Sequence, residues 1–288
     1  MSAAAYRRPR RLPLLAAALG LLTAAGLASA GAAAARRADG RITPLLYLPS
    51  GRYLKAAALG FDPILADVLY LWSIQYYSNY RIEDRYLYLE HIYRDVITEL
   101  DPRYVDPYLV GALIMTAEAR QPEMALRLLD KGIEHNPGDW ILPFEAGYVC
   151  YNDIKDYGRA ARYFEIALRS PEVHPAVRRF HAEMHNRAGD PRTSLREWAS
   201  IWETSDDPYV RTVAWNHVHD LRVEVDITTL RHAIGRFVAA RCRRPARLED
   251  LVAAGLLDAL PADPEGGAYA YDPARGEAAY RGSRILGR

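Results

Sequence analysis

The stretch that decides the fold runs from Phe144 to Leu168 and reads FEAGYVCYNDIKDYGRAARYFEIAL. Its second half follows Asp156 and places the small residues Ala160 and Ala167 on either side of the bulky Phe164. Offsets of four and three residues put these side chains on one face of a helix. A small residue there lets a second helix approach closely, and a bulky residue one turn later fills the space beside it. The stretch therefore predicts two helices packed against each other.

The same offsets recur 34 residues later and 35 residues earlier in the chain. The later copy has Ser194, Trp198 and Ile201, and the earlier copy has Ala125, Leu129 and Gly132. Prolines, which stop helices, close successive units at Pro102, Pro137, Pro171 and Pro208. One helix pair cannot cover its own apolar face, but stacked pairs share a continuous core. We therefore expect an all-α fold, a solenoid of antiparallel helix pairs.

This pattern resembles the tetratricopeptide repeat, most clearly in residues 144–151 followed by residues 156–168, and the resemblance extends over about residues 63–208. It implies a protein that binds other proteins in the groove formed by the first helix of each pair. In the register of the repeat, this groove is lined by Val110, Ile114, Glu145, Val149, Arg179 and Glu183. The lysines and asparagine with which some members of the family hold a partner's terminal carboxylate are absent from these positions.

The pattern remains helical beyond Pro208, with one helix expected over residues 209–222 and a second over residues 227–241, after Asp226 as N-cap. A short helix stopped by Gly255 follows. Tyrosines alternate with small residues on both sides of a turn near residues 273–276 and predict a two-stranded hairpin. This tail is similar to the C-terminal segment of type II secretion pseudopilins, but the chain lacks the methylation motif of a pilin.

The N-terminus has four arginines, an uncharged run from Leu12 to Ser29, and small residues around Ala30. This layout is typical of a secretory signal, and the run is also just long enough to span a bilayer. We expect an exported protein, either anchored in the inner membrane and facing the periplasm or free in the periplasm after cleavage. The expected organisation is a signal or anchor at 1–30, a linker or entry segment at 31–62, repeats at 63–225, and a capping helix with a helix and hairpin module at 226–288.

Tyrosines are concentrated near the first repeats, with nine between Tyr70 and Tyr108. A tyrosine combines a large apolar ring with a polar tip, which suits contact surfaces as well as cores. Core packing is the alternative for any of these side chains. We expect an aromatic partner-binding surface to include Tyr70, Trp72, Tyr76, Tyr77 and Tyr80.

Composition and motifs exclude several function classes. Four of the 37 basic residues lie before position 31, so the remainder has 33 basic against 36 acidic residues and lacks the positive excess typical of nucleic-acid binding. His181 and His185 could share one helix face toward a metal, but Glu183 is displaced from its place in a zinc protease motif. Packing is the preferred interpretation of both histidines, and no cofactor or catalytic residue is expected.

The sequence thus favours an exported scaffold that binds a protein partner during assembly of a cell-envelope system for secretion, pili or polysaccharide export. Two alternatives for the function stay open, and a third possibility makes the C-terminal tail a pilin-like docking piece. One is a soluble periplasmic module that binds peptides or glycans, and the other is a metal-dependent enzyme at His181 and His185.

Overall fold

The computed structural model describes residues 48–82 and 85–286. These residues divide into two compact units, one formed by residues 49–71 and 89–286 and the other by residues 48, 72–82 and 85–88. In chain order the elements are α2 (Gly51–Ala58), α3 (Asp62–Tyr77), η1 (His91–Ile97), α4 (Thr98–Leu100), α5 (Val105–Leu113), η2 (Ile114–Glu118), α6 (Pro122–His135), α7 (Ile141–Val149), η3 (Cys150–Ile154), α8 (Tyr157–Ala167), α9 (Ala176–Arg187), α10 (Pro191–Thr204), α11 (Pro208–Arg241), α12 (Glu249–Ala253), β1 (Ala270–Asp272) and β2 (Glu277–Ala279).

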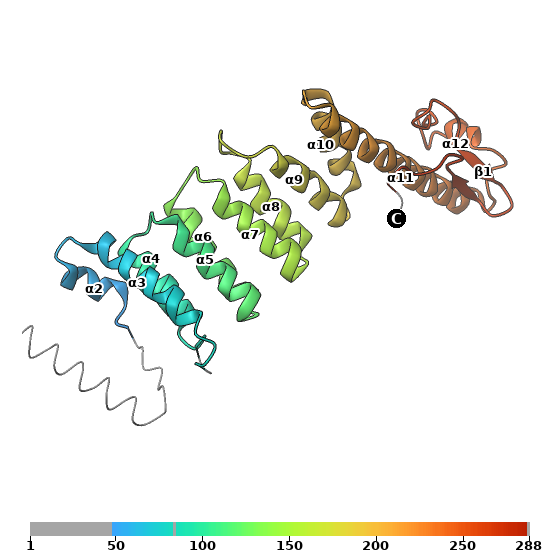
Figure 1. The fold of residues 1–288 in the computed structure, drawn as a ribbon. Helices are drawn as coiled ribbons and strands as arrows, with labels where there is room; N and C mark the ends of the chain where they lie inside the picture. The colour runs from blue at the N-terminus through green and yellow to red at the C-terminus, as the bar shows by residue number, and fades with distance from the viewer. Residues whose placement is uncertain (1–47, 83–84, 287–288) are drawn as a thin grey trace, which may run out of the picture. The chain divides into compact units, whose positions relative to one another are not determined.

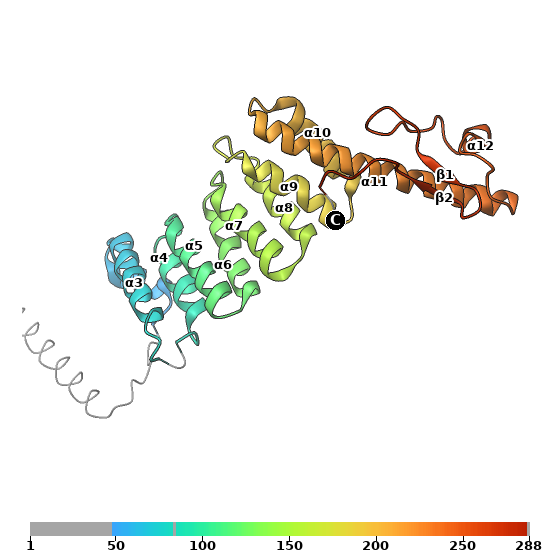
Figure 2. The same cartoon turned by 45° about the vertical axis from the view of Figure 1, so that its right-hand side comes forward.

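The larger unit contains stacked helix pairs (Figures 1 and 2). The first helix of each pair is α5 with η2, α7 with η3, or α9, and the second is α6, α8 or α10. Each helix packs on the one before it and the one after it, and α11 packs on α10. The predicted all-α fold class, a solenoid of helix pairs with a small C-terminal helix and hairpin, is confirmed.

Close approach between helices explains why small residues recur. A Cβ added at Gly147 on α7 would lie 2.6 Å from Cε1 of Phe164 on α8, and one at Gly111 would lie 2.6 Å from Cδ2 of Leu128 on α6. Phe164 and Leu128 are fully buried. The ring that the sequence marks as a packing residue thus rests directly on the backbone of the neighbouring helix.

Aspartates begin several helices. The Asp156 carboxylate accepts a hydrogen bond from the Arg159 backbone N–H at 2.9 Å, and Asp190 accepts one from Thr193 at 3.0 Å. Asp207 does the same at the start of α11. A carboxylate at this position satisfies otherwise unpaired N–H groups and interacts favourably with the helix dipole. The aspartates of the repeat therefore fix where the helices start.

Two of the first helices end in a π-helical turn. In η2 the N–H of Ala119 donates to the carbonyl of Ile114 at 2.9 Å, and η3 occupies the same place in the next pair. Residues with positive φ follow: Arg120 at 57° and Lys155 at 64°. A π turn accommodates one more residue than an α turn does. The corresponding helix α9 is α-helical along its whole length.

Carboxylates and arginines link successive second helices. Arg127 on α6 donates to both oxygens of Glu90 at 2.7 and 2.8 Å, and Arg159 on α8 donates to both oxygens of Glu123 on α6 at 2.9 and 3.2 Å. A planar guanidinium matches a carboxylate through two parallel bonds. Such ion pairs join α6 to Glu90 and to α8, although their partners stand at different positions of the repeat.

The prediction for the helices beyond residue 208 is wrong. The two helices expected at 209–222 and 227–241 are one continuous helix, α11, and Asp226 lies inside it, where its carboxylate accepts a hydrogen bond from the Tyr269 hydroxyl at 2.9 Å. The predicted boundary at 225 and 226 falls within this helix. The predicted linker or entry segment at 31–62 includes α2.

The C-terminal half of α11 carries the small module (Figure 2). Its core joins Phe237 and Leu230 on α11 to Leu251 on α12 and Tyr269 beside the hairpin. The predicted short helix and antiparallel hairpin are both present, with Tyr271 opposite Ala278. Long-range burial of apolar residues against α11 explains why this short segment is ordered.

Candidate protein-binding face

The predicted groove residues lie on the first helices, but two of them are buried. Ile114 is 9% exposed and Val149 is 5% exposed, whereas the residues just before them, Leu113 and Tyr148, are 62% and 40% exposed. The prediction that Ile114 and Val149 contact a partner is therefore wrong. Val110, Glu145, Arg179 and Glu183 are half-buried.

The π turns explain this shift of one residue. Counting back from the small residue of the second helix, Tyr148 precedes Ala160 by 12 residues, and Glu183 precedes Ser194 by 11. The additional residue is taken up by η3, and α9 has no such turn. A register counted back from the second helices therefore identifies the correct residue, Glu183, on α9. On α5 and α7 the same count identifies Ile114 and Val149, which are buried and lie next to the correct residues.

With this correction, one face of the first helices shows a regular row. Leu113, Tyr148 and Glu183 are each 35 residues apart. Leu109, Phe144 and Arg179 form a second row one helical turn earlier, and all three are half-buried. Burial raises the pKa of the Glu145 carboxyl beside these rows. We call the two rows together the first-helix face.

Aromatic rings dominate the centre of the first-helix face. Going along α7, successive ring centroids are 5.9 Å apart from Trp140 to Phe144, 6.4 Å from Phe144 to Tyr148, and 5.9 Å from Tyr148 to Tyr151. Phe180 on α9 lies 5.7 Å from Phe144 and 6.4 Å from Tyr151. Rings at such separations attract one another. They form a continuous aromatic stripe, which the spacing of Trp140, Phe144, Tyr148 and Tyr151 could have indicated in the sequence.

Cations lie at one end of this aromatic stripe. The Arg187 guanidinium is 5.4 Å from the ring centroid of Tyr151 and 5.7 Å from that of Tyr157, and the Lys155 ammonium is 5.8 Å from Tyr151. Arg187 also donates to Glu183 at 2.8 Å, and this hydrogen bond raises the pKa of Arg187. Rings beside cations suit a ligand that combines apolar groups with a carboxylate.

The predicted aromatic surface near the first repeats is only partly exposed. Tyr70 is 8% exposed and Tyr77 is 2% exposed, so the prediction that these two side chains form a contact surface is wrong, and packing accounts for both. Trp72 and Tyr76 are half-buried, with ring centroids 5.1 Å apart. Tyr80 is 72% exposed.

His181 and His185 make a close pair on α9. Their Nε2 atoms are 3.2 Å apart, and Nδ1 of His181 lies 3.9 Å from Glu197. Burial, reinforced by His185, lowers the pKa of His181. Among the described residues, no cluster of three or more histidine, cysteine, aspartate or glutamate side chains is arranged to hold a metal ion.

A second polar cluster lies where the C-terminal residues meet α11. Nδ1 of His219 is 2.8 Å from Asp220, Nε2 is 2.8 Å from Glu265, and the Tyr280 hydroxyl donates to Glu265 at 2.6 Å. Asp220 also accepts hydrogen bonds from the backbone N–H groups of Ile285 and Leu286, each at 2.9 Å. Sequence reasoning missed this cluster because its members are up to 66 residues apart.

The charges of this cluster reinforce one another. Burial alone would lower the pKa of His219, but its hydrogen bonds with Asp220 and Glu265 outweigh burial and raise that pKa. Burial would likewise raise the pKa of Asp220, but the Ile285 N–H and His219 outweigh it and lower that pKa. The cluster therefore fastens residues 285 and 286 to α11.

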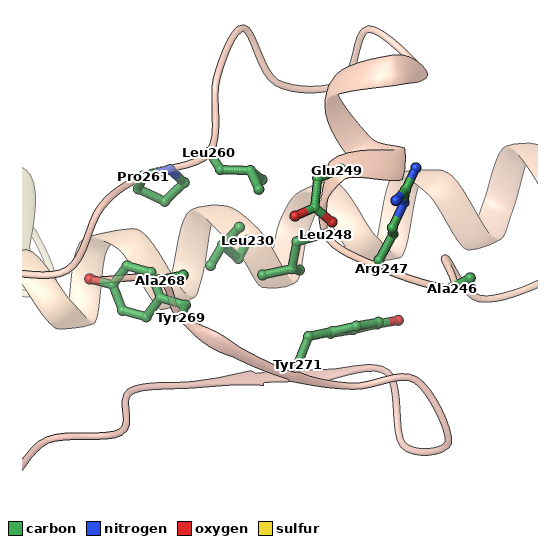
Figure 3. Close-up of a pocket in the computed structure, with 10 residues that line it drawn as sticks. All are labelled: Leu230, Ala246, Arg247, Leu248, Glu249, Leu260, Pro261, Ala268, Tyr269 and Tyr271. Carbon is green, nitrogen blue, oxygen red and sulfur yellow. The ribbon is translucent and has the colours of Figure 1, made fainter. Parts of the chain in front are cut away.

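Cavities in the described chain are small or are lined by both polar and apolar side chains. Figure 3 shows one of about 210 Å³ in the C-terminal module, between Leu230 on α11, Leu248 and Tyr271. The hydroxyls of its two tyrosines are already bonded, Tyr269 to Asp226 and Tyr271 to the carbonyl of Pro245, each at 2.9 Å. Packing of the module accounts for this cavity.

Comparison with known proteins leaves the family open. No family model and no curated protein matches the chain. A solved structure described as Naa15/Naa10 bound to HypK-THB is similar over 66% of this chain and 29% of that chain, with 15% identity and a TM-score of 0.38. So low a TM-score supports no conclusion, and the fold rests on the helix pairs themselves.

The described helices include none that is long and apolar enough to cross a membrane. The predicted signal or anchor at 1–30 lies outside the described residues.

Proposed function

We propose that this protein is a scaffold that binds protein partners through the first-helix face and takes no part in catalysis. The observation that carries this proposal is the regular row of the exposed Leu113 and Tyr148 and the half-buried Glu183, beside a continuous aromatic stripe. Aromatic side chains give binding energy at low entropic cost and are enriched at the centres of interfaces. The preferred ligand is a peptide segment with apolar side chains and a carboxylate that meets Arg187 or Lys155.

We further propose that the scaffold works outside the cytoplasm, held at the inner membrane by residues 1–30, in assembly of an envelope system. The support for export is the layout of the N-terminal sequence, with arginines before an uncharged run. A non-catalytic role is favoured because His181 is buried and paired with His185, which suits a packed pair.

Photo-cross-linking in living cells tests the binding face. A photoreactive residue replaces Tyr148, and the matched control replaces Arg162, which is exposed on the second helix α8. We expect a discrete adduct with an envelope protein from position 148 and none of the same mass from position 162. No adduct from position 148, or the same adduct from both positions, would contradict the proposed face.

A pair of substitutions tests the energetics of the same face. Tyr148→Ser removes a ring that is 40% exposed in the aromatic stripe, and Tyr209→Ser removes one that is 70% exposed at the start of α11. We expect the first to abolish capture of the cross-linked partner and the second to leave it unchanged. Mass spectrometry of the chain's N-terminus in the same samples separates an anchored chain from a cleaved one.

A further inference from the structure

Exposed apolar side chains gather at the N-terminal end of the larger unit. Six of the 15 large hydrophobic residues that are exposed in the described chain fall within the 19 residues from Tyr53 to Leu71. On α3 they are Ile64, Val68 and Leu71, which are 59%, 56% and 63% exposed and lie at helical offsets of four and three. They therefore form one stripe along the helix.

This stripe faces away from the packed side of α3. Ala66 is fully buried and Tyr70 is 8% exposed, and both lie about half a turn around the helix from the stripe. Leu59 and Phe61 continue the apolar surface into the turn between α2 and α3, where they are 84% and 66% exposed. We call Leu59, Phe61, Ile64, Val68 and Leu71 the α3 patch.

The composition of the α3 patch distinguishes it from the first-helix face. Its five members have no hydrogen-bonding side chain, whereas protein interfaces normally mix apolar anchors with polar groups and arginine. Polar side chains at its margin are the exposed Asp67 on α3 and, on α2, Tyr53, which is 72% exposed, together with Arg52 and Lys55. An apolar centre with tyrosine and basic residues at its margin suits the boundary between lipid tails and headgroups.

Chain connectivity supplies a second, independent reason. The uncharged run ends at Ser29, and α2 starts at Gly51, 22 residues later. Even fully extended, 22 residues reach only roughly 70 Å. The segment from residue 31 to 55 carries five basic residues against the single acidic Asp39. An anchored chain would therefore hold the patch near an anionic bilayer surface, where tethering makes even weak contacts effective.

We infer that the α3 patch lies on the surface of the phospholipid bilayer in which residues 12–29 are anchored. This inference rests on the proposed membrane anchor, and it adds that α3 of the folded body is in contact with lipid. A bilayer contact would fix the orientation of the solenoid relative to the membrane, which a 22-residue connection alone would not do.

Fluorescence quenching in proteoliposomes tests this inference on the full chain. Because Cys242 is exposed, it is first replaced by Cys242→Ser, while the buried Cys150 stays. An environment-sensitive label is placed at Val68→Cys, with Val238→Cys, 37% exposed on α11, as the matched control. Vesicles of phosphatidylethanolamine and phosphatidylglycerol carry nitroxide groups on their acyl chains, and an aqueous quencher reports exposure to water.

We expect the label at position 68 to be quenched several-fold more by the acyl-chain nitroxide than the label at position 238, and to be shielded from the aqueous quencher. Equal quenching at the two positions in floated proteoliposomes would overturn the inference while leaving the anchor intact. If the chain does not float with the vesicles, the anchor fails. In that case the chain is not bound to the vesicles, so the α3 patch contacts no lipid and the inference is overturned together with the anchor.

Discussion

The contact between Gly147 and Phe164 gives the sharpest test of the packing. In Gly147→Ala the new Cβ would meet Phe164 at 2.6 Å, 2.8 Å and 3.0 Å from three ring carbons. Carbon atoms prefer separations of about 3.5–4.0 Å, so the closest contact is about 1 Å too short. Phe164 cannot move away freely, because it is fully buried and its ring lies 5.7 Å from Phe144 and 5.6 Å from Phe180.

The same substitution elsewhere in the chain isolates the cost of this contact. Gly235 lies inside α11, and a Cβ added there meets no atom within 4 Å. Exchanging glycine for alanine in a helix gains about 1 kcal/mol from backbone propensity at either site. Overpacking a core costs about 1–3 kcal/mol. We therefore expect Gly235→Ala to stabilise the protein, and Gly147→Ala to be about 1–3 kcal/mol less stable than Gly235→Ala.

Urea unfolding of the full chain in a mild detergent, followed by circular dichroism, measures both free energies of unfolding. Adding Phe164→Leu to Gly147→Ala removes the ring that collides, so this double variant is expected to recover part of the loss. If Gly147→Ala were as stable as Gly235→Ala, the close approach of α7 and α8 at Gly147 would be wrong.

Two further predictions concern charged groups. The pKa of His219 is raised, so its contribution to stability is complete below the pKa of an unfolded histidine and is lost as pH rises through the raised pKa. The pKa of Asp220 is lowered, so its contribution is present above the pKa of an unfolded aspartate and is lost as pH falls through the lowered pKa. Hydrogen exchange at the Leu286 amide should therefore be slowest between these limits, and exchange that does not change with pH beyond its intrinsic chemistry would contradict the cluster. Glu90→Gln, which breaks the two-fold hydrogen bond from the half-exposed Arg127, should lower the free energy of unfolding by about 0.5–1 kcal/mol at low salt and by less at high salt, and an effect independent of salt would refute an ionic contribution.

The spacing of residues in the sequence was sufficient to predict the helix pairs, because the same packing contact recurs in each unit. Ala160, Phe164 and Ala167 are one unit of a recurring contact, and all three are fully buried. The N-cap aspartates Asp156 and Asp190 were part of the same repeated spacing. Each of these features depends on neighbours within one or two helices, so it repeats whenever the sequence does.

Tertiary contacts determine the features that sequence spacing did not predict, namely the continuity of α11 and the burial of individual tyrosines. Asp226 is an acceptable N-cap by residue type, but its carboxylate is held by Tyr269, 43 residues away, and the helix continues through it. The same holds for Tyr70 and Tyr77, whose burial depends on what packs over them. A tyrosine has the same appearance in a sequence whether its ring is covered or exposed.

The π turns link the fold to the proposed function. By adding a residue near the end of α5 and α7, they turn Leu113 and Tyr148 outward while Ile114 and Val149 pack inside. The two π turns stand at equivalent places in successive first helices. The aromatic stripe lies on the helix that ends in one of these turns, and Tyr151 within η3 contacts Lys155 and Arg187. The irregular turn therefore places the cations beside the rings, so a peptide bound along α7 would meet apolar surface first and positive charge at its end.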